Sequence, residues 1–276
     1  MNSRTRKRNT VLWFLLTLVL MLFTIAPVIW FMMVSIQPPD VARSGGLTFH
    51  FKPTLENYRN VFGKMKYMVF FKNSTIICLS STLIVVALGS MAAYAFTRKK
   101  GKFTSSVSSW VLSNKMFPPI AIVIPIYLMM SKLGLLDTYQ GMILIYTTIN
   151  VPYGVWMLMS FFDDIPVALD EAATVDGCNR AQALWHVVLP LASPGILSTG
   201  IFIFVLTWSE FLIALLLTGT NTKTLPVAIA AFINDRGIEW GPMSAAGTSL
   251  IIPLAILFYS IKKYLVRGLT FGAIKE

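Results

Sequence analysis

The sequence predicts an all-α protein that crosses a membrane several times. Of its 276 residues, 55% are hydrophobic and 13% are charged, whereas a soluble globular domain has roughly a quarter charged residues. The apolar residues gather in six long runs, and each supplies the ~20 mostly apolar residues that a helix needs to cross a bilayer. The expected transmembrane helices are residues 11–34, 73–97, 105–130, 139–162, 194–218 and 243–265.

The first run follows a cluster of basic residues between positions 4 and 8, an arrangement that secretory signal peptides share. Residues 11–36 carry no charge, and this stretch is longer than the roughly 7 to 15 residues of a signal-peptide core. We therefore expect a retained membrane anchor. The predicted organisation is a tail, anchor and external loop over residues 1–70, a core transmembrane domain over residues 71–265, and a C-terminal tail over residues 266–276.

The basic residues predict the side of the membrane on which each loop lies. Because consecutive spans alternate in direction, both tails, residues 98–102 and the polar segment 163–194 share one side. That side carries 13 of the 23 Lys and Arg residues, the other carries 9, and Lys115 lies within the third span. Basic clusters next to spans mark cytoplasmic loops, so both termini and the polar segment are expected in the cytoplasm. The net charge of +11 then reflects membrane orientation rather than nucleic-acid binding.

Residues 163–194 form the longest polar interruption in the second half of the chain and contain five of its twelve acidic residues. The good helix formers at residues 168–175 predict a short helix, for which Pro166 suits the first turn and Asp164 is placed to act as the cap. Gly177 then supplies the left-handed conformation that commonly ends a helix.

A second short helix is expected over residues 179–189, and Pro190 is expected to close it because proline cannot continue the hydrogen-bond ladder. The two helices would present Ala172 and Ala173 beside Glu171, and a helix with small side chains can enter a groove on a partner protein. Two other interpretations remain. One is an interfacial helix pair that only joins two spans. The other is a DNA-binding helix-turn-helix, which the acidic character disfavours because phosphates require Lys and Arg.

The residue spacing in this segment resembles the EAA loop of type I ABC importer permeases. The matching positions are Glu171-Ala172-Ala173, Gly177, Val187 and Leu189-Pro190. Three further stretches resemble the MalG-like branch, the permeases of binding-protein-dependent carbohydrate uptake. They are residues 117–119, residues 207–211 and residues 268–273. Members of the branch often have Asn where Ser209 stands.

The resemblance implies a multi-pass subunit of the bacterial inner membrane with the type I permease fold, forming half of the path for a sugar, oligosaccharide or related solute. It also implies a second, MalF-like permease, two cytoplasmic ATPase subunits that hold ATP and Mg²⁺, and an extracytoplasmic solute-binding protein as partners. This chain itself would need no cofactor. The residues expected to couple it to the ATPase are Glu171, Ala172, Ala173, Asp176, Gly177, Leu189 and Pro190.

The sequence shows no catalytic machinery. A G-x-x-x-x-G-K-[ST] phosphate loop is missing from the sequence. The two His residues have no metal-ligand spacing, and no set of nucleophile, base and orienting residue is evident. We therefore expect a transport subunit, not an enzyme, whose energy enters through a surface that a partner contacts.

The third predicted span is unusual because it carries a charge near its middle. Lys115 would be costly if it faced lipid, so it should face the protein interior or water. Pro118 and Pro119 follow it and bend the helix, which membranes tolerate where freed carbonyl groups line a cavity or meet neighbouring helices. The span is therefore a candidate border of the translocation path, and a kink used only for packing is the alternative.

Polar residues in later spans add candidates for the path. Asn150 lies in the fourth span, and Glu210 lies in the fifth beside Trp208, whose flat face could stack on a sugar or simply pack. Glu210 and Lys115 could instead form a structural ion pair. A different class of protein, a secondary transporter driven by an ion gradient, would use these two charges as its relay.

The external segment 37–72 is expected to contain a short capped helix over residues 54–62, with Tyr58 and Phe62 one turn apart. This helix is a candidate docking surface for an external binding protein, and a solvated linker is the alternative. The second large external loop, residues 219–242, has an apolar centre and could either tuck back against the outer mouth or touch the binding protein.

Overall fold

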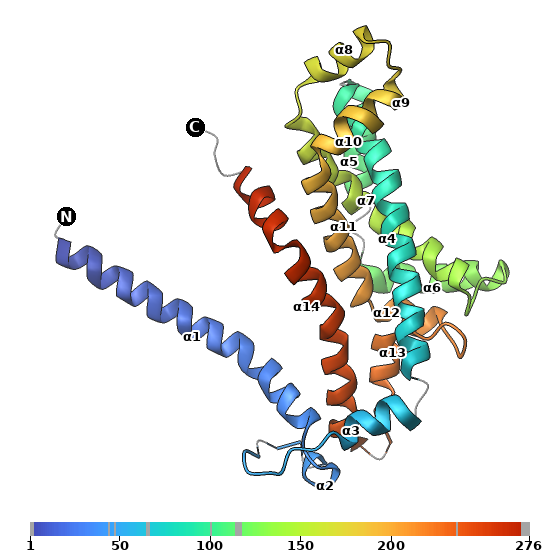
Figure 1. The fold of residues 1–276 in the computed structure, drawn as a ribbon. Coiled ribbons are helices and arrows are strands. Elements are labelled where there is room, and N and C mark those ends of the chain that lie inside the picture. Colours follow the sequence, from blue (N-terminus) through green and yellow to red (C-terminus); the bar gives the residue numbers. More distant parts are fainter. Residues whose placement is uncertain are drawn as a thin grey trace. The chain divides into compact units, whose positions relative to one another are not determined.

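A computed structural model describes residues 3–43, 45–46, 48–64, 67–99, 101–113, 118–235 and 237–271. The described residues are mostly helical (Figure 1). They include one small antiparallel hairpin. The chain divides into two units. One comprises Met1–Tyr67 with Ile229–Ile252, and the other comprises Met68–Ala228 with Pro253–Glu276.

The first unit contains the N-terminal helix and parts of the two segments that are predicted to be external. Its elements are α1 (Ser3–Ser35), α2 (Pro39–Ala42), α3 (Glu56–Arg59), the π-helical turn Asn60–Lys64, β1 (Ile233–Asn234), β2 (Gly237–Ile238) and the start of α14 (Trp240–Phe271). The Leu12–Ser35 part of α1 is apolar and long enough to cross a membrane, and it is largely exposed within the chain. This surface therefore suits contact with lipid or with another membrane subunit.

The short external helix expected near residues 54–62 is present as α3 and the π turn that follows it. The rings of Tyr58 and Phe62 stack with their centroids 6.4 Å apart. Asn57 is fully buried, and its amide donates hydrogen bonds to the carbonyl oxygens of Ser35 (3.1 Å) and Gln37 (2.8 Å). These bonds attach α3 to the end of α1, so the segment is a packed element rather than a solvated linker.

The second unit is a bundle of apolar helices. Its elements are α4 (Tyr67–Arg98), α5 (Lys102–Ser113), α6 (Pro119–Lys132), α7 (Tyr139–Asp163), α8 (Val167–Val175), α9 (Arg180–Ala183), the π turn Leu184–Val188, α10 (Leu189–Leu191), α11 (Ser193–Trp208), α12 (Leu212–Leu217) and α13 (Leu225–Ala230). Helices α4 and α7 approach closely where Gly89 lies against the backbone of Gly154, since a Cβ atom at Gly89 would lie 3.2 Å from the Gly154 carbonyl carbon. Small residues allow such close packing of membrane helices.

Four helices among the described residues are long and apolar enough to cross a membrane, and they lie in α1, α4, α7 and α14. A fifth span results if the bent pair Arg180–Leu191 and Ser193–Trp208 is counted as one. These helices confirm four of the predicted spans. The third and fifth predicted spans are not confirmed as single helices, and the total of six and the sidedness of the termini stay predictions.

Each of these two predicted spans consists of two helices, and each break has a local physical cause. The third predicted span is divided into α5 and α6, because Pro118 adopts an extended backbone ahead of Pro119 and α6 begins there. The fifth is divided into α11 and α12. The Glu210 carboxylate lies in this break and accepts hydrogen bonds from the backbone N–H groups of Ile213 (2.9 Å) and Ala214 (3.1 Å), so it caps α12.

Asp137 joins the loop before α7 to the loop after α12. Its carboxylate accepts the backbone N–H groups of Gly219 (2.8 Å), Asn221 (3.0 Å) and Thr222 (2.9 Å), and it also accepts the side chains of Asn221 and Thr222. Burial alone would raise the pKa of Asp137, but the bonds from Asn221, Gly219 and Thr222 outweigh it and lower the pKa to about 2. The two loops are therefore fixed to each other by one charged group.

We expect the Asp137→Asn variant to lose about 2 kcal/mol of unfolding free energy at neutral pH, because an amide cannot accept this set of hydrogen bonds. A carboxylate whose pKa is depressed in the folded state stabilises above its unfolded pKa, and that stability is lost as the pH falls toward its folded pKa. The difference in melting temperature from the wild type should therefore hold above about pH 5 and shrink as the pH falls toward about 2. Thermal unfolding followed by tryptophan fluorescence measures it. The exposed Asp235→Asn is the matched control, and equal stability of wild type and Asp137→Asn at pH 7 would contradict the assignment.

Candidate functional site

The polar segment folds into two short helices joined by a turn at Gly177, as the sequence predicts. Helix α8 spans Val167–Val175, and Gly177 has a φ of +90°, which residues with side chains rarely adopt. The N–H of Cys178 donates to the carbonyl oxygen of Ala173 (2.9 Å), and the N–H of Gly177 donates to that of Thr174 (3.0 Å). This pair of bonds is a Schellman motif, which closes the end of α8.

The start of α8 differs from the prediction. Pro166 occupies the N-cap position and provides no side-chain hydrogen bond, whereas Asp164 lies at the C-terminal cap of α7. Asp164 is therefore not the cap of α8. The physical reason is the short connection, because α7 continues to Asp163 and leaves only two residues, Asp164 and Ile165, before Pro166.

Two reciprocal hydrogen bonds close the first turn of the second helix, α9. The Asn179 side chain accepts the N–H of Gln182 (2.9 Å), and the Gln182 side chain accepts the N–H of Asn179 (2.8 Å). This reciprocal pair is a capping box. It fixes the point at which the chain turns back toward the bundle.

Pro190 does not end this helix at residue 189 as predicted. A π turn over Leu184–Val188 shifts the ladder by one residue, and Leu189 donates its N–H to the carbonyl oxygen of Leu184. Pro190 then falls in the first turn of α10, where its missing N–H is tolerated. The helical path continues to Leu191 and then bends by 81° into α11.

The inner face of the segment packs on the ends of α4 and α7. Leu184 and Val188 belong to one apolar cluster with Ala93, Leu158 and Phe162. Figure 1 shows α8, α9 and α10 at one end of the bundle formed by α4, α7 and α11. The loop is thus a folded extension of the bundle.

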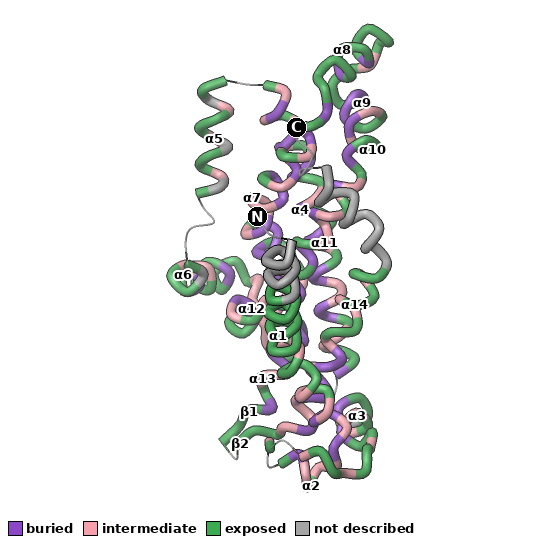
Figure 2. The backbone as a smooth tube through the Cα atoms, turned by 90° about the vertical axis from the view of Figure 1, so that its left-hand side faces the viewer, coloured by how far each residue is buried: buried purple, intermediate pink, exposed green. Residues whose placement is uncertain are grey.

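Most of α8 is exposed (Figure 2), and only Asp170 and Ala173 are buried. The residues of the predicted coupling set therefore divide between two faces. The exposed members are Glu171, Ala172, Asp176, Gly177 and Pro190, whereas Leu189 is half-buried and Ala173 is buried. Val175 and Trp185, which are 88% and 61% exposed, add apolar surface to the outer face.

Asp170 is the functional candidate that the sequence analysis missed. Its Oδ2 atom lies 2.5 Å from the Nε atom of Arg98, and its Oδ1 atom accepts the hydroxyl of Tyr94 (3.0 Å). Both partners lie near the end of α4, more than 70 positions earlier in the chain. No local sequence signal reports such a long-range pair.

Three of the predicted path residues gather at the break between α11 and α12. Buried Asn150 donates its amide to the carbonyl oxygen of Tyr146 (2.9 Å) and to the hydroxyl of Thr207 (3.4 Å). The Tyr146 hydroxyl donates to Glu210 (2.9 Å). Trp208 is 1% exposed. Its ring stacks on Phe204 with centroids 5.4 Å apart and makes a T-shaped contact with Phe71.

The other three path candidates belong to the divided third span. Pro118 is exposed and precedes α6, which begins at Pro119. Lys115 lies outside the described residues, and so does its predicted pairing with Glu210. The described partners of the Glu210 carboxylate are Tyr146 and the first turn of α12.

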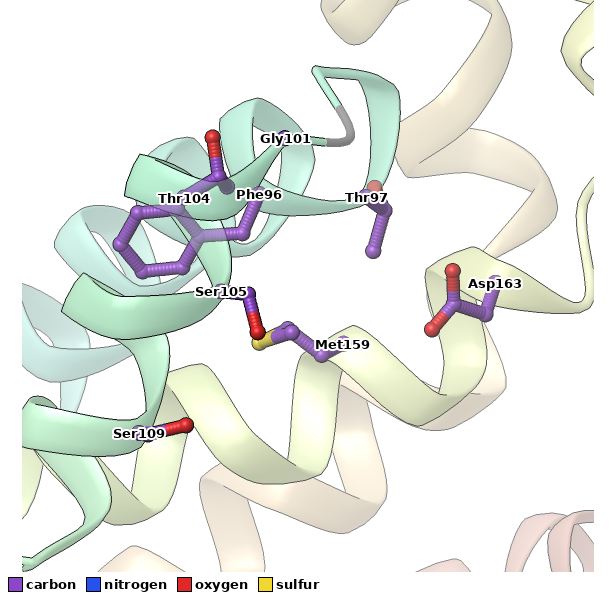
Figure 3. A pocket seen from close by; sticks show the side chains of 8 residues that line it. All are labelled: Phe96, Thr97, Gly101, Thr104, Ser105, Ser109, Met159 and Asp163. Atoms are coloured by element: carbon purple, nitrogen blue, oxygen red, sulfur yellow. The ribbon is translucent and has the colours of Figure 1, made fainter.

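A polar cavity of about 410 Å³ lies between the ends of α4 and α7 and the first turns of α5 (Figure 3). Hydroxyl groups of Thr104, Ser105 and Ser109 line it from α5, and Asp163 lines it from α7. Met159 and Phe96 add apolar surface. The sequence analysis did not single out this hydroxyl-rich face.

A bundle of apolar helices that carries a compact polar two-helix loop at one end is typical of a multi-pass membrane protein. Residues 85–271 match the family described as "binding-protein-dependent transport system inner membrane component", and the chain belongs to this family. It is therefore an ABC importer permease, a transport component that is not an enzyme. This result confirms the resemblance found in the sequence and supports the importer over the ion-gradient-driven alternative.

The chain is similar over nearly its full length to permeases of known systems. It is 38% identical over 253 residues to the trehalose/maltose transport system permease protein MalG of Thermococcus litoralis, covering 90% of this chain and 91% of that protein. Its fold matches a bacterial ABC transporter involved in the import of the acidic polysaccharide alginate, with a TM-score of 0.79, 22% identity and coverage of 96% and 99% of the two chains. It also matches the alginate transporter solved in complex with an alginate pentasaccharide-bound periplasmic protein, with a TM-score of 0.69, 18% identity and coverage of 93% and 94%.

We expect the Asn179→Ala variant to destabilise α9 and the π turn by about 1 kcal/mol, because it removes the acceptor for the Gln182 N–H. Amide hydrogen exchange over residues 180–188 should then accelerate about fivefold relative to the wild type. Asn179→Ser, which restores a capping oxygen, is the matched control. Equal exchange rates in the wild type and Asn179→Ala would show that the box does not hold this turn.

Proposed function

We propose that this permease forms half of the translocation path for a sugar or oligosaccharide in the bacterial inner membrane, with both termini in the cytoplasm. The names of the related trehalose/maltose permease and of the alginate importers support a carbohydrate substrate. A solute-binding protein outside the membrane delivers the substrate, by analogy with the alginate transporter solved with its periplasmic protein. A second, MalF-like permease completes the path.

The observation that carries the proposal is the geometry of the loop 163–194. Its outer face is exposed and offers a carboxylate beside small residues, at Glu171 and Ala172, together with the apolar side chains of Val175 and Trp185. This composition suits insertion into a groove on a partner. Two cytoplasmic ATPase subunits, which bind ATP and Mg²⁺, are the proposed partners.

The loop is built to transmit a movement rather than to absorb it. The Schellman motif ends α8 without a flexible linker, and the capping box starts α9 two residues after Gly177. The helical path then bends directly into α11. A push on Glu171, Ala172, Asp176 or Gly177 would therefore rotate rigid elements, which is what coupling between two states requires.

The break between α11 and α12 is the proposed border of the path. Non-helical backbone at membrane depth is tolerated where it is buried in protein or lines a water-filled cavity. Glu210 is half-buried at this break and Ser209 is exposed, so this short stretch offers polar groups to a solute. Buried Asn150 and Trp208 pack beside it, and Lys115, Pro118 and Pro119 of the third predicted span remain proposed path-lining residues.

We expect the Gly177→Val variant to keep the complex assembled but to abolish stimulation of ATP hydrolysis by the loaded binding protein. No atom of the described residues lies within 4 Å of a Cβ at this position, so the effect comes from the φ of +90°, which costs about 1 to 3 kcal/mol for a branched residue. Gly177→Asn is the matched control, because Asn tolerates left-handed backbone better, and it should retain most of the stimulation. The assay is ATP hydrolysis by the complete transporter in lipid nanodiscs. Stimulation of Gly177→Val equal to that of the wild type would contradict the proposed role of the loop.

A further inference from the structure

Helix α8 buries few of its own side chains. Of its nine residues only Asp170 and Ala173 are buried, and Ala173 contributes a single methyl group. The other side chains of α8 are exposed, from Val167 to Val175 (Figure 2). Among the described residues, Asp170 is therefore the buried polar side chain through which α8 contacts α4.

The partners of Asp170 extend this contact to two long helices. Arg98 and Asp170 form an ion pair with side chains that are 10% and 11% exposed, and Tyr94 donates its hydroxyl to the same carboxylate. The Nη1 atom of Arg98 also donates to the carbonyl oxygen of Phe162 (3.2 Å), in the last turn of α7. The guanidinium carbon lies 5.8 Å from the centre of the Tyr94 ring. One guanidinium thus touches α7 and α8 while it belongs to α4.

The energetics of this cluster point to a role other than stability. A buried ion pair is often no more stabilising than apolar residues of the same volume, because both charges lose their hydration. Replacing only one of the two partners is costly, because the remaining charge stays buried without an opposite charge. Leu184 and Val188 already hold the loop to the bundle by apolar contact. The ion pair instead fixes the position of α8 relative to α7, because a planar guanidinium binds two acceptors in fixed positions.

We infer that Arg98, Asp170 and Tyr94 are positioning residues that transmit the movement of α8 to α4 and α7. This inference rests on the proposed coupling of the loop to an ATPase. When a partner displaces the outer face of α8, the Asp170 carboxylate draws Arg98 with it, and Arg98 carries the displacement to the ends of both long helices. The loop is thereby linked to two helices that are remote from it in sequence, in addition to α11, which follows it directly.

The test compares Asp170→Asn, Arg98→Gln and the double variant in the complete transporter in nanodiscs, with binding protein loaded with maltose or with trehalose. We expect each single change to lower the stimulation of ATP hydrolysis about tenfold, a typical size for coupling between sites. Each should also lower the melting temperature of the complex. The double variant should recover the melting temperature because no unpaired buried charge remains, but it should stay uncoupled, since Gln is too short to reach both Phe162 and position 170.

Lys99→Gln is the matched control, because it removes an exposed positive charge next to Arg98 in the chain, and it should match the wild type. A double variant that regains stimulation together with stability would show a merely structural pair and overturn the inference. Single variants with wild-type stimulation would do the same. A wild-type complex without copurifying ATPase, or without stimulation, would instead refute the proposed function itself.

Discussion

Helix ends leave backbone N–H and C=O groups without partners inside the helix, and in the second unit side chains of the same chain satisfy several of them. The Glu210 carboxylate accepts hydrogen bonds from N–H groups in the first turn of α12. The Asp137 carboxylate accepts hydrogen bonds from N–H groups of the loop that follows α12. Asn179 and Gln182 do the same at α9. Most of the informative polar residues of this unit therefore sit at interruptions of helices.

The same constraint makes the loop 163–194 a rigid body. A loop of this length with unsatisfied backbone groups would be held by water and would be free to bend. Here the Schellman motif and the capping box close both helices at the turn, and the π turn carries the path through Pro190 into α11. An exposed outer face on a rigid element is what a motor subunit needs in order to move a transmembrane helix that it does not touch.

The sequence predicted those parts of this arrangement that depend on neighbouring residues. Residues 168–175, Gly177 and four of the spans follow from propensity, backbone geometry and hydropathy, and the spacing around Glu171 was enough to identify the family. The missed features depend on contacts between distant residues or on local geometry that composition does not encode. The Asp170 pair joins residues far apart in the chain, and the π turn that changes the role of Pro190 has no compositional signature.

The most direct test is a photoreactive amino acid placed at Ala172, in the centre of the exposed face of α8, in transporter assembled in native membranes. The account predicts covalent adducts with the cytoplasmic ATPase subunit, and far fewer adducts from the same probe at the buried Ala173. Adducts from Ala172 with lipid alone, or with a protein on the outer side of the membrane, would contradict it.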